Sequence, residues 1–170
     1  MLIDLGGEPF MTLISLLLLA AALCAGLIAG AFFAFSSFVM GALGRLPARD
    51  GIAAMQSINI VVINPLFLGV FMGTALLAVV LMILAWFDGV AAGMGYLLGA
   101  SAFYLVGTFG VTMIGNVPLN NALAAAGPES QEGAAIWAGY LKRWVWWNHV
   151  RTVAATLASA GFILALCEIA

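Results

Sequence analysis

The side chains best suited to chemistry lie together near the start of the last apolar run. The segment Trp144-Val145-Trp146-Trp147-Asn148-His149-Val150-Arg151-Thr152 holds three tryptophans, an amide, the only histidine of the chain and an arginine. On a helix, Asn148, Arg151 and Thr152 are spaced at i, i+3 and i+4, so they share one face. His149 is turned by roughly 100° from Asn148, so it either borders that face or leaves it. Such a concentration of hydrogen-bonding groups in so apolar a chain predicts a functional site.

Two of these groups have the properties of a reaction centre. Histidine changes its charge near neutral pH, which suits a base that removes a proton. Arginine and amide side chains can hold the negative oxygen that such a step creates, above all in dry surroundings. A histidine beside tryptophans at a membrane interface is as often an anchor, so both roles remain open for His149.

The composition places this segment in a membrane. The chain is 65% hydrophobic and 7% charged, more apolar than the interior of a 170-residue soluble domain can accommodate. Apolar runs near 10–43, 64–87, 91–115 and 146–166 each exceed the roughly 18 residues that mark a spanning helix. We therefore expect one all-α domain over 1–170, an up-down bundle of four transmembrane helices. An amphipathic segment around Trp137, Tyr140 and Trp144 is expected before the fourth helix, lying in the interface or leading into that helix.

The charges predict the orientation of the bundle. Arg45 and Arg49 fall between the first two runs, and Lys142 and Arg143 precede the fourth, whereas the other ends carry only acids. By the positive-inside rule both basic connections face the cytoplasm and both termini face outside, in what we expect to be a bacterial plasma membrane. The aromatics expected to form a belt at the cytoplasmic interface are Trp137, Tyr140, Trp144, Trp146 and Trp147, with Trp86 and Tyr96 at the opposite interface.

Two further features bear on processing and on cofactors. Asp4 and Glu8 stand where a signal peptide has positive charge, so we expect the first helix to be retained. Cys24 and Cys167 form no C-x-x-C motif, and one histidine cannot supply two haem ligands. We expect no cofactor and no metal.

Polar residues of other helices fall at the same predicted level. Tyr104, Thr108, Thr112, Asn116 and Asn120 recur at steps of four and predict a slanting polar ridge that runs toward the cytoplasm. Proline is expected to kink the chain after Asn64 and to break or bend it at 118. The residues expected at the cytoplasmic ends of helices two to four are Gln56, Asn59, Asn64, Asn116, Asn120, Asn121, Asn148, His149 and Arg151. They either cross-link the helix ends or line a ligand pocket.

Four motifs resemble those of a known family. They are Met55-Gln56-Ser57-Ile58-Asn59, Asn64-Pro65, Asn116-Val117-Pro118-Leu119-Asn120 and Trp147-Asn148-His149-Val150-Arg151-Thr152. Together they resemble the anthrone-oxygenase-like family of small four-helix membrane proteins, over nearly the whole chain. The resemblance implies a four-helix bundle and, as in some fungal members, oxidation of an anthrone to an anthraquinone by molecular oxygen without an evident cofactor.

The resemblance leads to a specific hypothesis about the residues. An anthrone has a weakly acidic carbon-bound proton, and its anion can react directly with oxygen. We expect His149 to be the base and Arg151 to hold the oxyanion with the amides, while Trp144 or Trp147 stacks on the rings. The expected substrate-binding residues are Gln56, Asn59, Asn64, Asn116, Asn120, Asn148, Trp144 and Trp147.

Other functions compete with this hypothesis. Small residues four apart, such as Gly69 with Gly73 and Gly95 with Gly99, suit a non-enzymatic membrane scaffold that packs through close helix faces. A small-molecule transporter would need a continuous polar path, yet polar residues become rare beyond Tyr104. The partners we expect are membrane lipid, a hydrophobic aromatic small molecule and a second copy of the chain, and no nucleic acid.

Overall fold

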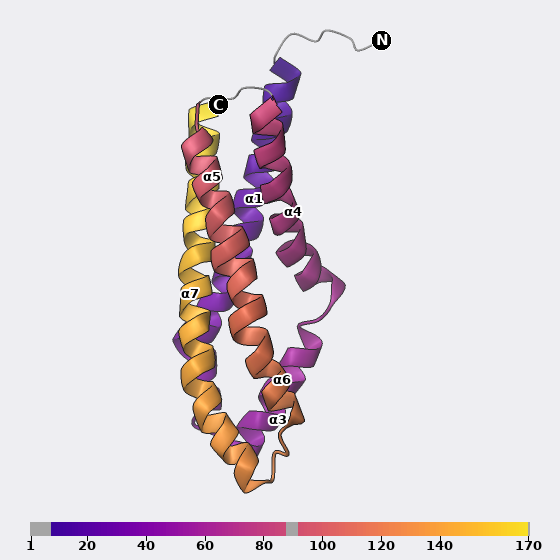
Figure 1. Cartoon of the computed structure of the whole chain (residues 1–170), viewed down its shortest axis with the longest axis vertical. Coiled ribbons are helices and arrows are strands. Elements are labelled where there is room, and N and C mark those ends of the chain that lie inside the picture. Colours follow the sequence, from indigo (N-terminus) through magenta and orange to yellow (C-terminus); the bar gives the residue numbers. More distant parts are fainter. Residues whose placement is uncertain (1–7, 88–91, 170) are drawn as a thin grey trace.

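Four long apolar helices make up most of the part of the chain that the structure describes. The computed structural model describes residues 8–87 and 92–169, and these ranges contain no strand. The helices long and apolar enough to cross a membrane are Leu13–Leu43, Pro65–Phe87, Met94–Ala125 and Gln131–Ile169. Figure 1 shows them running up and down in one bundle, with the start of α1 and the end of α7 at the same end. The predicted four-helix membrane bundle is confirmed.

The elements follow one another with few interruptions. In chain order they are α1 (Glu8–Ala34), the π-helical turns η1 (Phe35–Val39), α2 (Met40–Leu43), α3 (Ala48–Val61), α4 (Pro65–Phe87), α5 (Met94–Ala102), the π-helical η2 (Phe103–Gly110) and η3 (Thr112–Asn116), α6 (Val117–Ala125) and α7 (Gln131–Ile169). The first span combines α1, η1 and α2, and the third combines α5, η2, η3 and α6. The predicted tight turn at Asp88 lies outside the described residues.

The π-helical turns change the course of the predicted polar ridge. A step of four residues rotates a side chain by slightly more than one full turn about the axis of an α-helix. In a π-helix, where hydrogen bonds join residues i and i+5, the turn is wider and the same step covers slightly less than one full turn. From Phe103 to Asn116 the chain is π-helical except at Val111, and from Val117 it is α-helical. The whole row lies on the inward side: Tyr104, Thr108 and Asn116 are buried, and Thr112 and Asn120 line a cavity. The chain also continues as helix through residue 118 instead of breaking there.

Helix two is divided rather than kinked. α3 ends at Val61 and α4 begins at Pro65, so the chain is not helical between them. The Asn64 side chain joins the two ends, because Nδ2 donates to the Val61 carbonyl at 2.9 Å and Oδ1 accepts from the Phe67 N–H at 3.0 Å. Asn64 thus caps α4. In Figure 1 the chain swings outward at this junction, and the first turns of α4 lean away from α6.

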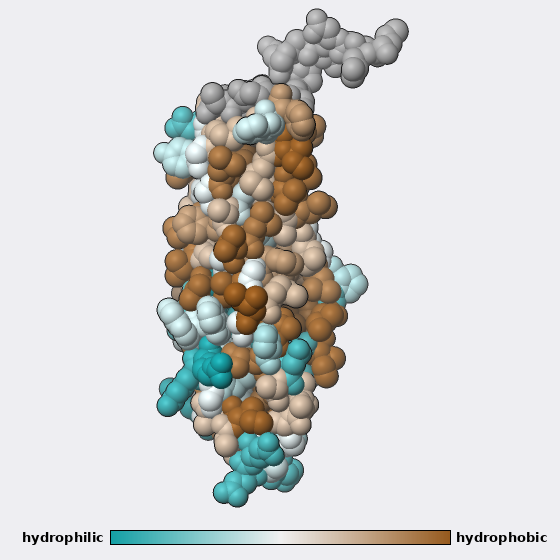
Figure 2. Space-filling model, in the orientation of Figure 1, coloured by the Kyte–Doolittle hydropathy of each residue, from teal (hydrophilic) through white to brown (hydrophobic). Residues whose placement is uncertain are grey.

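We call the end of the bundle built from α3, α6 and the first turns of α7 the α3 end. Figure 2 shows mostly brown hydrophobic side chains on the upper part of the molecule and more teal hydrophilic ones toward this end. The 39 residues of α7 extend about 58 Å, against a hydrocarbon core of roughly 30 Å, so helix remains to project beyond the apolar layer. Which side of the membrane the α3 end faces stays a prediction.

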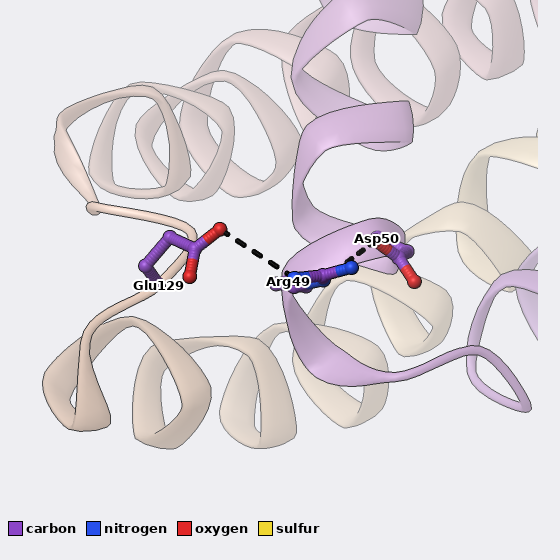
Figure 3. A network of polar contacts seen from close by, with 3 residues as sticks. All are labelled: Arg49, Asp50 and Glu129. Atoms are coloured by element: carbon purple, nitrogen blue, oxygen red, sulfur yellow. Dashed lines mark hydrogen bonds and ion pairs between the residues drawn. The ribbon is translucent and has the colours of Figure 1, made fainter.

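An exposed ion-pair network joins the start of α3 to the α6–α7 connection at the α3 end (Figure 3). Arg49 Nε lies 3.1 Å from Asp50 Oδ1, and Arg49 Nη1 lies 3.8 Å from Glu129 Oε1. Pairs this exposed contribute little to stability. The network marks the contact between the start of α3 and the α6–α7 connection.

The aromatic belt predicted at the cytoplasmic interface is wrong for three of its members. Trp137, Tyr140 and Trp144 are buried, and their rings stack in succession at centroid distances of 5.6 and 5.9 Å. Their i, i+3, i+7 spacing fits a helix that packs on protein as well as one that lies on lipid, and α3 and α6 supply the protein. The amphipathic segment is therefore the first part of α7 and leads directly into the fourth span.

Of the other predicted belt residues, Trp146, Trp86 and Tyr96 are exposed as a belt requires. Trp147 is half-buried.

Close helix contact predicts opposite effects for two glycine substitutions in the third span. A Cβ at Gly107 would stand 2.6 Å from the Ala154 Cβ on α7, whereas a Cβ at Gly99 would meet nothing within 4 Å. We expect Gly107→Ala to destabilise the fold by about 1–3 kcal/mol through overpacking. Gly99→Ala should be neutral or stabilising because alanine is the better helix former. Thermal unfolding in detergent measures both, and equal effects would contradict this packing.

Candidate functional site

A cavity of about 290 Å³ lies between α1, the α3–α4 junction, η3 and α7. Its volume is near the lower end of the range typical of small-molecule sites. Aromatic rings form much of the wall, namely Phe32, Phe35, Phe67, Phe71 and Trp144. The polar residues that reach it are Asn59, Thr112, Asn120 and Arg151. The remaining lining is aliphatic: Ala31, Met55, Ile58, Val62, Ile63, Leu68, Met72, Met113 and Val117.

Among the lining residues that the structure describes, Arg151 is the only charged one. Its side chain is 7% exposed, and its guanidinium carbon lies 3.8 Å from the centre of the Phe32 ring and 4.9 Å from that of Trp144. Nε donates to Asn148 Oδ1 at 2.8 Å, and Nη1 is 3.4 Å from Thr112 Oγ1. Among the described residues no carboxylate pairs with it. Ring faces and neutral oxygens thus surround a full positive charge.

Asn148 fixes the position of this arginine. Its Nδ2 donates to the Phe32 carbonyl at 2.7 Å and to Ser36 Oγ at 2.6 Å, while its Oδ1 accepts from Arg151. Ser36 Oγ also lies 3.2 Å from Thr152 Oγ1. The predicted common face of Asn148, Arg151 and Thr152 is therefore what joins α7 to the end of the first span. The π-helical turn η1 lies directly at this contact, where such turns often mark function.

A second set of hydrogen-bonded side chains forms the part of the cavity wall nearer the α3 end. Asn120 Oδ1 accepts from Tyr140 Oη and from Trp144 Nε1, both at 2.8 Å. Asn116 Nδ2 donates to the Trp144 carbonyl at 3.2 Å. These bonds hold the Trp144 ring beside Arg151, so the tryptophan is a rigid wall rather than a mobile one.

Two buried amide atoms near the cavity have no hydrogen-bond partner within residues 8–87 and 92–169. They are Nδ2 of Asn59, which lines the cavity, and Oδ1 of Asn116. Buried polar atoms are almost always paired in folded proteins, so each unpaired one calls for an explanation. For Asn59, a ligand in the cavity with a polar atom that accepts a hydrogen bond from Nδ2 would explain the missing partner.

Three other residues predicted to bind substrate make contacts that stabilise the fold instead. Gln56 Nε2 donates to the carbonyls of Leu123 and Ala126 at 2.8 and 3.0 Å, so it caps the end of α6. Asn64 caps α4. The Trp147 ring packs on Gly115, where a Cβ would stand 2.7 Å from it. None of the three lines the cavity.

His149 also stands apart from the cavity. Its side chain is exposed and takes no part in the cavity wall. Two residues along a helix correspond to about 200°, so His149 faces nearly opposite to Arg151. The sequence left open whether His149 borders the polar face or leaves it, and in the structure it leaves it. The geometry therefore offers no support for His149 as a base in this cavity.

Several contributing residues were not among the predicted site residues. Ser36 was noticeable only because it is one of two polar residues in the second half of the first span. Phe32 and Phe35 belong to a phenylalanine-rich stretch whose other members, Phe33 and Phe38, are exposed. The composition of this stretch does not tell which two of the four rings face inward, because the π-helical turn η1 changes the helical phase along it.

Comparison with known proteins identifies the family. The family model described as anthrone oxygenase matches residues 66–161, more than half of the chain. The chain belongs to the anthrone oxygenase family. No curated protein and no solved structure matches it. The residues matched to the anthrone oxygenases include Asn116, Asn120, Asn148 and Arg151, whereas α3 lies before the matched segment.

The two neighbours Asn148 and His149 should differ sharply in their effect on stability. Asn148→Ala leaves the Arg151 Nε, the Phe32 carbonyl and Ser36 without their partner, which costs about 1–3 kcal/mol for a buried group. His149→Ala removes an exposed side chain and should change the free energy of unfolding by about 0.5 kcal/mol or less. Thermal unfolding of both variants in the same detergent is the measurement. A His149 variant as unstable as the Asn148 variant would contradict the described contacts.

Proposed function

We propose that the cavity binds a lipophilic aromatic molecule that carries an ionisable oxygen, and that the protein oxidises it with molecular oxygen. An anthrone or a quinol-like compound is the substrate class. The observation that carries this proposal is the buried guanidinium of Arg151, which stands in an aromatic wall without a carboxylate partner among the described residues.

The energetic argument concerns the charge. Burial of a cation in an apolar medium is costly unless an anion or several hydrogen bonds compensate it. Arg151 has one short bond, to Asn148, and one long contact, to Thr112. A bound phenolate or enolate oxygen would add the missing negative charge, and a buried charge kept at such a cost usually serves a function.

The shape of the wall suits a flat ligand. Phe71 is stacked with Phe67 and Phe109 at centroid distances of 6.2 and 5.6 Å, and Trp144 is fixed by Asn120. A cavity of 150 Å³ is known to hold benzene, so about 290 Å³ suits roughly two to three fused rings. Asn59 Nδ2 would donate to a second oxygen of the same ligand.

The reaction needs little from the protein beyond this electrostatic support. Loss of a carbon-bound proton to water leaves an anion whose negative charge rests on the ring oxygen, next to Arg151. The carbon of the anion then reacts with molecular oxygen, a carbon–oxygen bond forms, and cleavage of the oxygen–oxygen bond releases water. A methylene group and one O₂ thus give a carbonyl group and one H₂O. Arg151 would favour the anion throughout, because a preorganised cation acts most strongly in dry surroundings.

Packing into oligomers is a second candidate function, supported by a separate observation. Gly69 and Gly73 on α4, and Gly95 and Gly99 on α5, leave space in which an added Cβ would meet nothing within 4 Å. Small faces of this kind allow close approach of another helix. The cavity favours binding of a small molecule as the main role of the protein. A homo-oligomer is compatible with that role.

Substitution of Arg151 tests the proposal. Arg151→Gln should weaken binding of a hydroxylated anthrone by about 10- to 100-fold, as expected for loss of a charge-assisted hydrogen bond. It should have far less effect on an analogue whose hydroxyl groups are O-methylated and whose methylene carbon is dimethylated, because that analogue has neither a phenolic nor a carbon-bound proton to lose. His149→Gln is the matched control and should leave both affinities unchanged. Ligand-induced thermal stabilisation gives the affinities, and oxygen uptake with product absorbance gives the turnover.

Two results would reject the proposal. One is a wild-type protein that neither binds nor oxidises hydroxylated anthrones. The other is an Arg151→Gln variant that binds the ionisable compound as tightly as the wild type does.

A further inference from the structure

The cavity is closed on three sides by buried side chains. Toward the α3 end, Met55 and Trp144 are 1% and 3% exposed. Toward the opposite end, Phe71 is buried and its carbonyl accepts a hydrogen bond from Tyr104 Oη at 3.0 Å. On the side of α1 and α7, Phe32 and Arg151 are buried against each other. None of these walls gives a ligand direct access.

The fourth side is exposed and entirely apolar. The exposed lining residues are Ile63 at the α3–α4 junction, Leu68 and Met72 on α4, and Met113 on η3, with exposed fractions of 69%, 37%, 50% and 50%. We call these four residues the rim. In a spanning helix, apolar side chains exposed in this way contact lipid rather than water.

The position of the rim along α4 places it within the apolar layer. Leu68 and Met72 lie three and seven residues after Pro65, or about 5 and 11 Å along the helix axis. α4 has 23 residues, about 35 Å, so it is only slightly longer than the hydrocarbon core. Leu68 and Met72 therefore lie inside the hydrocarbon region near the α3 end, and Ile63 lies next to its border.

The divided second helix accounts for the opening. Since α3 stops at Val61 and α4 restarts at Pro65, the first turns of α4 are displaced outward (Figure 1). Two of the four rim side chains are methionines, which are unbranched and adapt their shape to a passing molecule. The rim is thus both open and easily deformed.

We propose that the ligand enters this cavity sideways from the lipid bilayer, through the rim between α4 and η3. This inference rests on the proposed function and adds that the ligand arrives dissolved in the membrane, in its neutral form. It ionises only after it reaches Arg151, because a charged molecule crosses an apolar rim poorly. The substrates are then compounds that partition strongly into lipid.

A reversible cross-link across the rim tests this route. The variant carries Leu68→Cys and Met113→Cys in a background with Cys24→Ala and Cys167→Ser, and a flexible bifunctional thiol reagent joins α4 to η3. The control joins the same two spans outside the cavity lining, through Leu76→Cys and Phe103→Cys, both exposed positions. Both are reconstituted in lipid nanodiscs, with a hydroxylated anthrone as the probe.

The rim cross-link should slow association of the probe by about tenfold or more, and reduction of the cross-link should restore the rate. The control cross-link should leave the rate within about twofold. If the cross-linked rim variant does not stay folded, Met113→Trp, which fills the rim without a cross-link, carries the same expectation. Unchanged association in a folded rim-blocked variant would overturn lateral entry.

The two proposals fail in distinguishable ways. Absence of probe binding to the uncross-linked wild type rejects the proposed function itself. Normal binding to the wild type and equally fast binding to the blocked rim rejects only the lateral route. A sulfonated, water-soluble analogue provides the second arm: it should associate slowly with the wild type in nanodiscs, and fast association would show entry from water.

Discussion

The structure depends on one unusual arrangement, a positive charge held in an apolar bundle with no carboxylate among the described residues to pair with it. Asn148 makes this arrangement possible, because its amide binds the first span with one end and Arg151 with the other. The faces of Phe32 and Trp144 supply the remaining attraction. The proposed role of Arg151, to favour a bound anion, rests on this arrangement.

Irregular backbone shapes the space around this charge. Two π-helical turns, η1 and η3, and one helix break lie in the elements that line the cavity. The third π-helical segment, η2, supplies Tyr104 to the core that packs through small residues such as Ala78, Ala100 and Ala158. π-helical turns are rare and are frequently found at functional sites. The cavity thus lies among the irregular elements, and the packed core lies in the other half of the bundle.

The sequence predicted the architecture and the common face of Asn148 and Arg151, because hydrophobic length and helical spacing are local properties. It could not show whether the His149 side chain joins the polar face of α7 or points away from it. A side chain turned by roughly 100° from Asn148 fits either direction until the helices that pack against α7 are known. It mistook Trp137, Tyr140 and Trp144 for an interfacial belt for a similar reason, because the amphipathic pattern does not tell whether protein or lipid covers the apolar side. The cavity itself arises from the displaced start of α4, which no local pattern encodes.

The central claim is that Arg151 stabilises the ionised form of a bound aromatic ligand, and the absorbance spectrum of that ligand tests it most directly. Neutral and ionised hydroxyanthrones differ in colour, so a pH titration of the bound compound reports its charge state. Our account predicts that the ligand ionises at a lower pH when bound to the wild type than when free, and that Arg151→Gln abolishes the difference. A bound ligand that ionises at the same pH as the free one, or at a higher pH, would contradict the account.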